Sequence, residues 1–332
     1  MSWFTKLTGI EEKSPAQVRE QLSVDGDCFV CPGGKRIAFG RLETPKLSEL
    51  RRTVANLQTE SRPSTLREVV GDVRSLHADP ANAGALFQVA SQFNLLEMTG
   101  PLVTPERGVG IYENDPTQGP ACAIACGAGT IYRNYFADVG GQTGQSANKQ
   151  IDCSADLGQR LGNTGGYLWK MQNGYLFPSD EGLAEVTKTI RAASGADRET
   201  LLGELRIGLQ LDAEVTLEGA GHRVSQAYCS ALPVAYSRQP ADRWGDFAQL
   251  VLDAAYEATL AAAVVNAVQT GSRVVYLTLL GGGVFGNRDE WIVGAIERAF
   301  CKHAQRGLDV RIVSYSRSKP VVAELVSHLT RI

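Results

Sequence analysis

The sequence predicts an α/β protein, a three-layer α/β/α sandwich built around a mixed sheet. Two segments, Ala85–Ala90 and Val274–Leu280, are largely apolar on both faces, as expected of central strands that helices cover on each side. Trp244–Thr270 is rich in alanine and predicts one long helix. Strands and helices alternate after residue 61, which is the order typical of such a sandwich.

The first 60 residues are predicted to form an N-terminal extension, and residues 61–332 one α/β domain. Ser14 before Pro15 predicts a capped helix that runs to Leu22. Two short strands are expected around the Gly33-Gly34 turn, and a charged amphipathic helix is expected over Lys46–Glu60.

The other predicted elements follow from their hydrophobic periodicity. Strands are expected at Leu66–Val70, Ile207–Leu217, Val224–Val234 and Val310–Tyr315, and helices at Ala121–Tyr135, Leu183–Arg206 and Trp291–Gln305. Thr99–Gly119 is rich in Pro, Gly, Asn and Asp and predicts a long loop. Loops of that length in a compact domain are usually functional or disordered.

Composition excludes several classes of protein. The net charge of the 332 residues is -3 and no long basic run occurs, so a nucleic-acid duplex is not an expected partner. The N-terminus lacks a Sec-type signal, and polar residues interrupt the apolar segment Val251–Val268, so no membrane span is expected. An odd number of cysteines, seven, fits reduced thiols in the cytoplasm, although delivery into another cell by a route without a Sec signal stays open.

No metal site is expected. Cys28 and Cys31 form a CxxC pair, but the Pro-Gly-Gly that follows indicates a turn, and no second close pair completes a zinc ribbon. A magnesium ion on loop carboxylates is neither indicated nor excluded, and no cofactor is required.

The most informative motif is a strand, glycine-loop, helix unit from Arg273 to Ala299. Its loop residues are Gly281, Gly282, Gly283, Val284, Phe285, Gly286 and Asn287. Open α/β sheets bind ligands where strands end, and glycine lets several backbone N–H groups approach an anion. The loop lacks the Lys-Ser/Thr of a Walker motif and the GxGxxG spacing, so the prediction is a phosphate loop of another kind, with a purely structural turn as the alternative.

These residues resemble a known family. GGGVFGN after an apolar strand resembles the second phosphate loop of macrodomains, the ADP-ribose-binding fold. Val69-Val70-Gly71-Asp72-Val73 resembles the strand end at which a macrodomain aspartate receives the adenine amino group and the next N–H contacts the base. Gln88–Asn94 resembles the strand that ends in the asparagine holding the distal ribose. The resemblance implies a macrodomain-like fold, with Asp72, Val73 and Asn94 as ligand-binding residues.

The chain departs from that family after Asn94. The usual glycine-rich stretch and catalytic aspartate do not follow, and the Gly-Gly-Gly with paired glutamates of poly(ADP-ribose) glycohydrolases is absent there. Cleaving a ribose at its anomeric carbon needs a carboxylate or phosphate to orient a water, stabilisation of an oxocarbenium-like centre, and help for the leaving group, and two carboxylates near one ribose would suffice. The candidates are Glu97, Asp115 and Glu106, with Gln118 as a further ligand-binding side chain.

Three functions stay open from the sequence. The first is an ADP-ribosylhydrolase that releases ADP-ribose from a modified protein or small molecule. The segment TQGPACAIACGAGTIYRNYF, from Thr117 to Phe136, resembles a branch that acts on protein side chains, with ubiquitin as one candidate. The second is a non-catalytic ADP-ribose reader, and the third is another nucleotide or sugar-phosphate hydrolase.

Overall fold

The computed structural model describes residues 1–58, 60–217 and 219–330. Its centre is a seven-stranded mixed sheet in the order β4-β11-β12-β6-β13-β14-β5. The strands are β4 (Arg41–Glu43), β5 (Thr65–Val70), β6 (Leu86–Ala90), β11 (Gly208–Glu214), β12 (Arg223–Cys229), β13 (Val274–Leu277) and β14 (Asp309–Ser314). The five strands from β12 to β5 are parallel, and β4 and β11 join them in antiparallel register.

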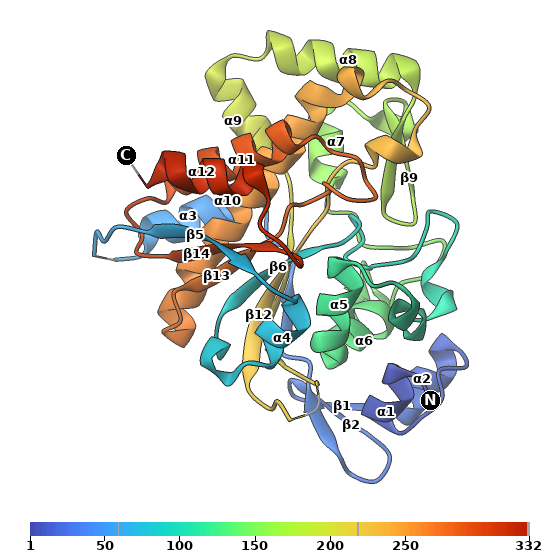
Figure 1. Ribbon diagram of the computed structural model, residues 1–332. Coiled ribbons are helices and arrows are strands. Elements are labelled where there is room, and N and C mark those ends of the chain that lie inside the picture. Colours follow the sequence, from blue (N-terminus) through green and yellow to red (C-terminus); the bar gives the residue numbers. More distant parts are fainter. Residues whose placement is uncertain (59, 218, 331–332) are drawn as a thin grey trace.

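Helices cover both faces of this sheet (Figure 1). One layer contains α3 (Leu47–Asn56), α10 (Gly245–Thr270), α11 (Asp289–Lys302) and α12 (Pro320–Leu329). The other contains α4 (Val73–Ala78), α5 (Gln118–Ala125) and α6 (Gly127–Tyr135). The predicted three-layer α/β/α architecture with a mixed sheet is therefore confirmed.

Helix α10 is the core of its layer. The segment Ala241–Thr270 is long and apolar enough to cross a membrane by length and composition, but 83% of its most apolar window is buried inside the fold. It contacts α3, α8 (Asp180–Ala192), α9 (Gly195–Gly203) and α11 as well as three central strands. Its apolar character is thus explained by burial on all sides, as for the core helix of a large domain.

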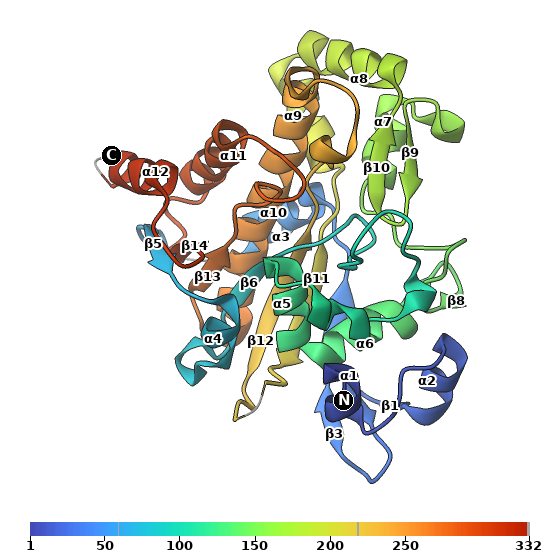
Figure 2. The ribbon, with the colours of Figure 1, turned by 45° about the vertical axis from the view of Figure 1, so that its right-hand side comes forward.

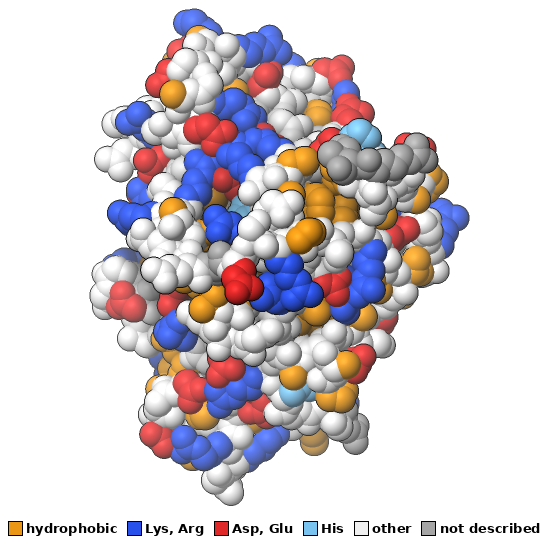
Figure 3. Space-filling model, turned by 90° about the vertical axis from the view of Figure 1, so that its left-hand side faces the viewer, with side chains coloured by type: hydrophobic (Ala, Val, Ile, Leu, Met, Phe, Trp, Pro, Cys, Tyr) orange, Lys and Arg blue, Asp and Glu red, His pale blue; other side chains and the backbone are white. Residues whose placement is uncertain are grey.

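Charged side chains clamp the helices of this layer together. Glu257 of α10 is 2% exposed and bonds Arg51 of α3 and both Arg298 and Lys302 of α11. These cations hold the pKa of the Glu257 carboxyl at about 2 against the cost of its burial. Basic and acidic side chains are interspersed over the neighbouring surface rather than separated (Figure 3).

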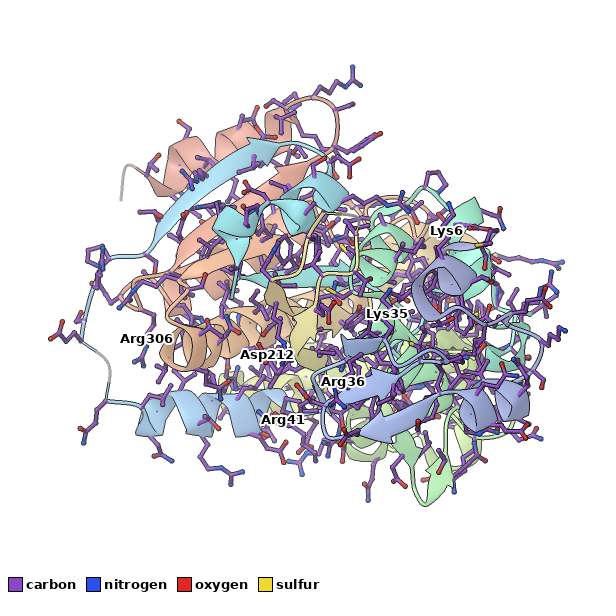
Figure 4. The ribbon with its side chains drawn as sticks, turned by 90° about the horizontal axis from the view of Figure 1, so that it is seen from below. Lys6, Lys35, Arg36, Arg41, Asp212 and Arg306 are labelled. Atoms are coloured by element: carbon purple, nitrogen blue, oxygen red, sulfur yellow. The ribbon has the colours of Figure 1, made fainter. Side chains whose placement is uncertain are left out.

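The N-terminal segment builds a second, smaller apolar cluster. It comprises α1 (Trp3–Thr8), α2 (Pro15–Gln21) and a sheet of β1 (Ser23–Asp25), β2 (Cys28–Val30) and β3 (Arg36–Ala38). Their apolar side chains pack on α6 and on the loop before α5. Seen from below, Lys6, Lys35 and Arg36 mark this segment, and Arg306 lies on the opposite side of the molecule (Figure 4). The region predicted as an extension also supplies β4 and α3 to the main layers.

A further group of elements lies beyond the carboxyl ends of the parallel strands (Figure 2). It contains α7 (Ala155–Leu161), the hairpin of β9 (Trp169–Gln172) and β10 (Tyr175–Pro178), α8 (Asp180–Ala192) and α9 (Gly195–Gly203). The small hairpin of β7 (Asp138–Val139) and β8 (Gln142–Thr143) precedes it in the chain. The turn at Gly174 contacts the loop after β6, where a side chain would meet Asn94 at 2.5 Å.

Two predicted helices are each divided in the structure. The segment Ala121–Tyr135 breaks at Cys126, whose φ of −116° and ψ of 60° are not helical. The segment Leu183–Arg206 breaks because Ser194 caps a new helix by accepting the N–H of Asp197. Side-chain capping competes with helix continuation, and a pattern of apolar positions alone does not reveal it.

Candidate functional site

A cavity of about 220 Å³ opens at the carboxyl ends of the central parallel strands. This is the edge at which open α/β sheets bind ligands. Its walls come from the loop after β6, the loop before α5, β10, the loop after β12 and the glycine loop after β13. The lining residues are Ala90, Ser91, Gln92, Glu97, Met98, Thr99, Asp115, Thr117, Gln118, Gly119, Pro120, Tyr175, Ala231, Tyr236, Thr278, Leu279, Leu280, Gly281, Gly283, Val284 and Phe285.

The glycine loop carries unbonded backbone donors on residues that line the cavity. Within residues 1–58, 60–217 and 219–330, no acceptor is bonded to the N–H groups of Gly281, Gly283, Val284 and Phe285, and these four residues line the cavity. Gly281 has a φ of 75°, and a side chain there would meet the Cβ of Ala231 at 2.4 Å. Glycine is thus required at this turn, and clustered free N–H groups are a recognised anion-binding arrangement.

Glu97 is the buried acid of the site. Its side chain is nearly inaccessible, and neither of its carboxyl oxygens has a hydrogen-bond partner among the described residues. Its backbone N–H donates to the hydroxyl of Tyr112 at 3.0 Å. Burial raises the pKa of the Glu97 carboxyl to about 8, because removal from water disfavours the charged form. At neutral pH the group therefore holds a proton.

The turn that delivers Glu97 is strained. Leu95 has a φ of 65°, although it is a buried residue other than glycine. Such conformations cost on the order of 1–3 kcal/mol and persist where the surroundings enforce them, often at functional sites. Here the carbonyl oxygen of Leu95 accepts a bond from Nε of Arg133 at 3.0 Å, and its N–H donates to the carbonyl of Gln92.

Asp115 is the second carboxylate of the cavity and is half-buried. Its Oδ1 accepts the N–H of Thr117 at 2.9 Å, which places the carboxylate just before the start of α5. The close approach of α5 to β6 fixes this position, because a side chain at Gly119 would meet the carbonyl oxygen of Ala90 at 2.1 Å. Unlike Glu97, Asp115 has access to water.

Gln118 lines the cavity, but its side chain also ties two elements together. Its Oε1 accepts the N–H of Ala90, and its Nε2 donates to the carbonyl of Gln88 and to the sulfur of Cys122. The Gln118 amide thereby bonds the backbone of β6 at Gln88 and Ala90, beyond the residues of β6 that pair with β13. All polar atoms of the Gln118 side chain are engaged before any ligand arrives.

Three aromatic rings form one wall. Phe285 of the glycine loop lies 5.4 Å from Tyr175 and 5.7 Å from Tyr236, measured between ring centroids. The Tyr175 hydroxyl donates to the carbonyl of Met98 at 3.1 Å, which fixes the ring against the loop that carries Glu97. An apolar wall opposite polar groups suits the face of a sugar or base.

The structure brings together some of the predicted site residues and not others. Glu97, Asp115, Gln118, Gly281, Gly283, Val284 and Phe285 line one cavity. Gly282, Gly286 and Asn287 belong to the same loop but not to the lining, and Asn287 fixes the loop by donating from Nδ2 to the carbonyl of Leu232.

The remaining predicted residues lie outside the cavity lining. Asp72 and the buried Val73 follow β5 at the same edge of the sheet, where Asp72 caps α4 by accepting the N–H of Arg74. Asn94 is buried, and its amide bonds Gln150 and the N–H of Leu96. Glu106 is exposed and accepts the N–H of Ala147. Their predicted roles in binding or catalysis stay predictions.

Several lining residues were not among the site residues predicted from the sequence. Ser91 and Gln92 follow β6 directly, and their position at a strand end could have indicated them. Tyr175 and Tyr236 come from a hairpin and a loop far away in the chain, and only the tertiary fold brings them to the site. The burial of Arg133 gave no signal in the sequence either, because its partners Leu95 and Gln210 lie far from it along the chain.

Metal-ligating side chains do not cluster in the part of the chain that the structure describes, since no group of three or more His, Cys, Asp or Glu residues is found there. The chemistry available in the cavity is that of two carboxyl groups in different environments. One is buried and protonated and the other is in contact with water, a division that suits general acid and base roles.

Comparison with known proteins gives similarity to solved structures alone. No protein-family model matches the sequence, and no curated protein does. The similar structures include poly(ADP-ribose) glycohydrolase from Deinococcus radiodurans in complex with ADP-ribose, with 12% identity over 88% of this chain and 94% of that one and a TM-score of 0.45. The glycohydrolase from Thermomonospora curvata has 12% identity over 96% of both chains and a TM-score of 0.44, and it is also known bound to the inhibitor ADP-HPD.

Proposed function

We propose that this chain is an ADP-ribosylhydrolase that binds ADP-ribose across the edge of its sheet and cleaves the bond at the anomeric carbon of the distal ribose. The observation that carries the proposal is one cavity with two features. Four glycine-loop residues offer free N–H groups to a diphosphate, and two carboxyl groups in unlike surroundings lie in the same cavity.

The size of the cavity supports partial enclosure of the ligand. At about 220 Å³ it is smaller than the roughly 300–1,000 Å³ typical of pockets that enclose a whole drug-sized ligand. The distal ribose and the adjoining phosphate fill it, and the adenosine lies outside. The ends of β5 and β14 offer the exposed Asp72 carboxylate and the Tyr315 ring, 74% exposed, as partners for the base. Val284, 64% exposed, lies on the glycine loop at the cavity rim.

The two carboxyl groups have separate roles in the reaction. Asp115 accepts a proton from the attacking water as the new bond to the anomeric carbon forms. Glu97, protonated at neutral pH, gives its proton to the leaving atom as the old glycosidic bond breaks. The balance is one water consumed and free ADP-ribose released together with the protonated acceptor. The proton taken by Asp115 then returns to Glu97 through solvent.

The acceptor is proposed to be a side chain of a modified protein, with ubiquitin as one candidate. The support is the resemblance of Thr117–Phe136 to a branch acting on protein-linked ADP-ribose. Within this segment the structure contains the start of α5 beside the cavity.

Calorimetry with ADP-ribose, and with ADP, AMP and NAD as comparisons, tests the binding half of this proposal. We expect micromolar binding of ADP-ribose, weakened in Asp72→Ala. Hydrolysis of ADP-ribosylated ubiquitin and of a mono-ADP-ribosylated peptide tests the second half. Asp115→Asn is expected to lower kcat by about 10²–10⁴-fold, because general acid-base groups contribute that much, while binding is retained. Absence of ADP-ribose binding at millimolar concentration overturns the function, and binding without turnover makes the chain a reader.

A further inference from the structure

Next to Glu97 of the cavity lies a fully buried guanidinium group that is not part of the cavity lining. The Arg133 side chain has 0% exposure. Its Nε donates to the carbonyl of Leu95, its Nη2 to the hydroxyl of Thr130 at 3.0 Å, and its Nη1 to Oε1 of Gln210 at 3.5 Å. All three of its nitrogen atoms are engaged inside the protein. Arg133 is therefore not available as a phosphate contact.

The same group lies against the acid of the site. Nη2 of Arg133 is 3.8 Å from Oε1 of Glu97, too far for a hydrogen bond but close enough for a strong charge interaction in a dry interior. The guanidinium carbon lies 3.6 Å from the ring centroid of Tyr228, so the ring faces the charge. The Tyr228 hydroxyl in turn donates to Gln226 at 2.6 Å, which holds the ring in place.

Among the residues that the structure describes, four titratable or charged groups face Glu97 from the surrounding elements. They are Arg133 of α6, Tyr112 of the segment Gly110–Asn114, Cys122 of α5 and Tyr228 of β12. Burial raises the pKa of the Tyr112, Cys122 and Tyr228 side chains well above their usual values, so these three stay neutral. The charge of Arg133 is thus the one that acts on Glu97 from within this shell.

We propose that Arg133 is the positioning residue of Glu97: it holds the strained turn at Leu95 that delivers the carboxyl group, and its charge sets how readily that group releases its proton. Without it, the buried carboxyl would hold the proton too firmly to donate it to a leaving atom. With a direct hydrogen bond, the carboxylate would be stabilised and the proton lost too early. The separation of 3.8 Å lies between these two limits.

The effect of Arg133 on catalysis rests on the proposed hydrolase function, whereas its effect on the titration of Glu97 can be measured without any turnover. The experiment is a carbon-13 NMR titration of the ligand-free protein carrying labelled glutamate carboxyl groups, with Glu97→Gln identifying the Glu97 resonance. In Arg133→Met we expect the titration midpoint of Glu97 to rise by about 1–3 pH units, since an opposite charge nearby shifts a carboxyl by that amount. Tyr228→Phe keeps the ring under the guanidinium and is the matched control, with an unchanged midpoint.

An unchanged midpoint in a folded Arg133→Met protein overturns the inference, and so does an equal shift in Tyr228→Phe. If Arg133→Met does not fold, Arg133→Gln decides, because it removes the cation and keeps an amide that can donate to the carbonyl of Leu95. A raised midpoint of Glu97 then supports the inference, and a midpoint identical to that of the wild type refutes it. A shifted titration in a protein that hydrolyses nothing would mean that the function is wrong while the placement of Arg133 is right.

Discussion

The protonation of Glu97 makes a quantitative prediction about stability. In the folded protein the pKa of this carboxyl is about 8, against an ordinary value of 4.5. Between these two values the folded chain holds a proton that the unfolded chain has released, so stability falls as pH rises through this window. From pH 4.5 to 7 the loss is about 3 kcal/mol, at about 1.4 kcal/mol for each pH unit, and above pH 8 it approaches about 5 kcal/mol. Full burial of the group means that solvent screening does not reduce these figures.

The perturbation is Glu97→Gln, which keeps the shape of the side chain and removes its titration. Free energies of unfolding are measured by urea denaturation from pH 4.5 to 9 at constant ionic strength. We expect the wild type to lose stability relative to Glu97→Gln by about 3 kcal/mol between pH 4.5 and 7. Glu20→Gln, at an exposed position, controls for the change of net charge. Wild-type and Glu97→Gln curves that run parallel over this range would refute the assignment of Glu97 as a buried, protonated acid.

Three further predictions follow from the packing. Gly281→Ala meets the Cβ of Ala231 at 2.4 Å with a φ of 75°, so it should lower stability by about 1–3 kcal/mol and weaken ADP-ribose binding at least tenfold. Gly195→Ala, which has open space around it and lies outside the cavity lining, should bind normally in the same calorimetric assay. The pKa of Glu257 is lowered from 4.5 to about 2, so ionised Glu257 stabilises the fold above pH 4.5 and this stabilisation is lost as pH falls toward 2. Glu257→Gln should therefore lower the free energy of unfolding by about 3 kcal/mol at neutral pH and make it less dependent on pH between 4.5 and 2. A urea midpoint at neutral pH equal to that of the wild type would contradict the ion-pair clamp. Six of the seven cysteines are buried and Cys301 is exposed, so a thiol reagent should modify one group rapidly in the native protein and none in Cys301→Ser.

The sequence predicted the layers of the fold because its strongest signals were local. Continuous apolar segments identified β6 and β13, and the alanine-rich segment identified α10. The helix boundaries were predicted wrongly where side-chain capping or tertiary packing interrupts a helical pattern of apolar residues. Ser194 ended one helix by capping the next, and Cys126 broke another where Gly127 packs against Trp3.

The site was predictable in part for the same reason. Glycines after a buried strand indicated the loop, and loop carboxylates indicated Glu97 and Asp115, all of which line one cavity. The order of residues along the chain could not show that the amide of Asn94 is bonded elsewhere, or that Tyr175 and Tyr236 form a wall. The burial of Arg133 depends on contacts with β11 and β12, which lie far from it in sequence.

The way the chain threads through the sheet has a consequence for its synthesis. The edge strand β5 pairs with β14, so residues near 65 wait for residues near 314 before they have a partner. The cavity likewise takes its walls from segments spread between residues 90 and 285. During synthesis, the antiparallel strands β4, β11 and β12 are therefore available for pairing before the last wall of the cavity has been made. Non-local pairing of this kind slows folding and leaves strand edges exposed for longer. The cavity is thus complete only once the glycine loop up to Phe285 has been made, long after the loop that carries Glu97.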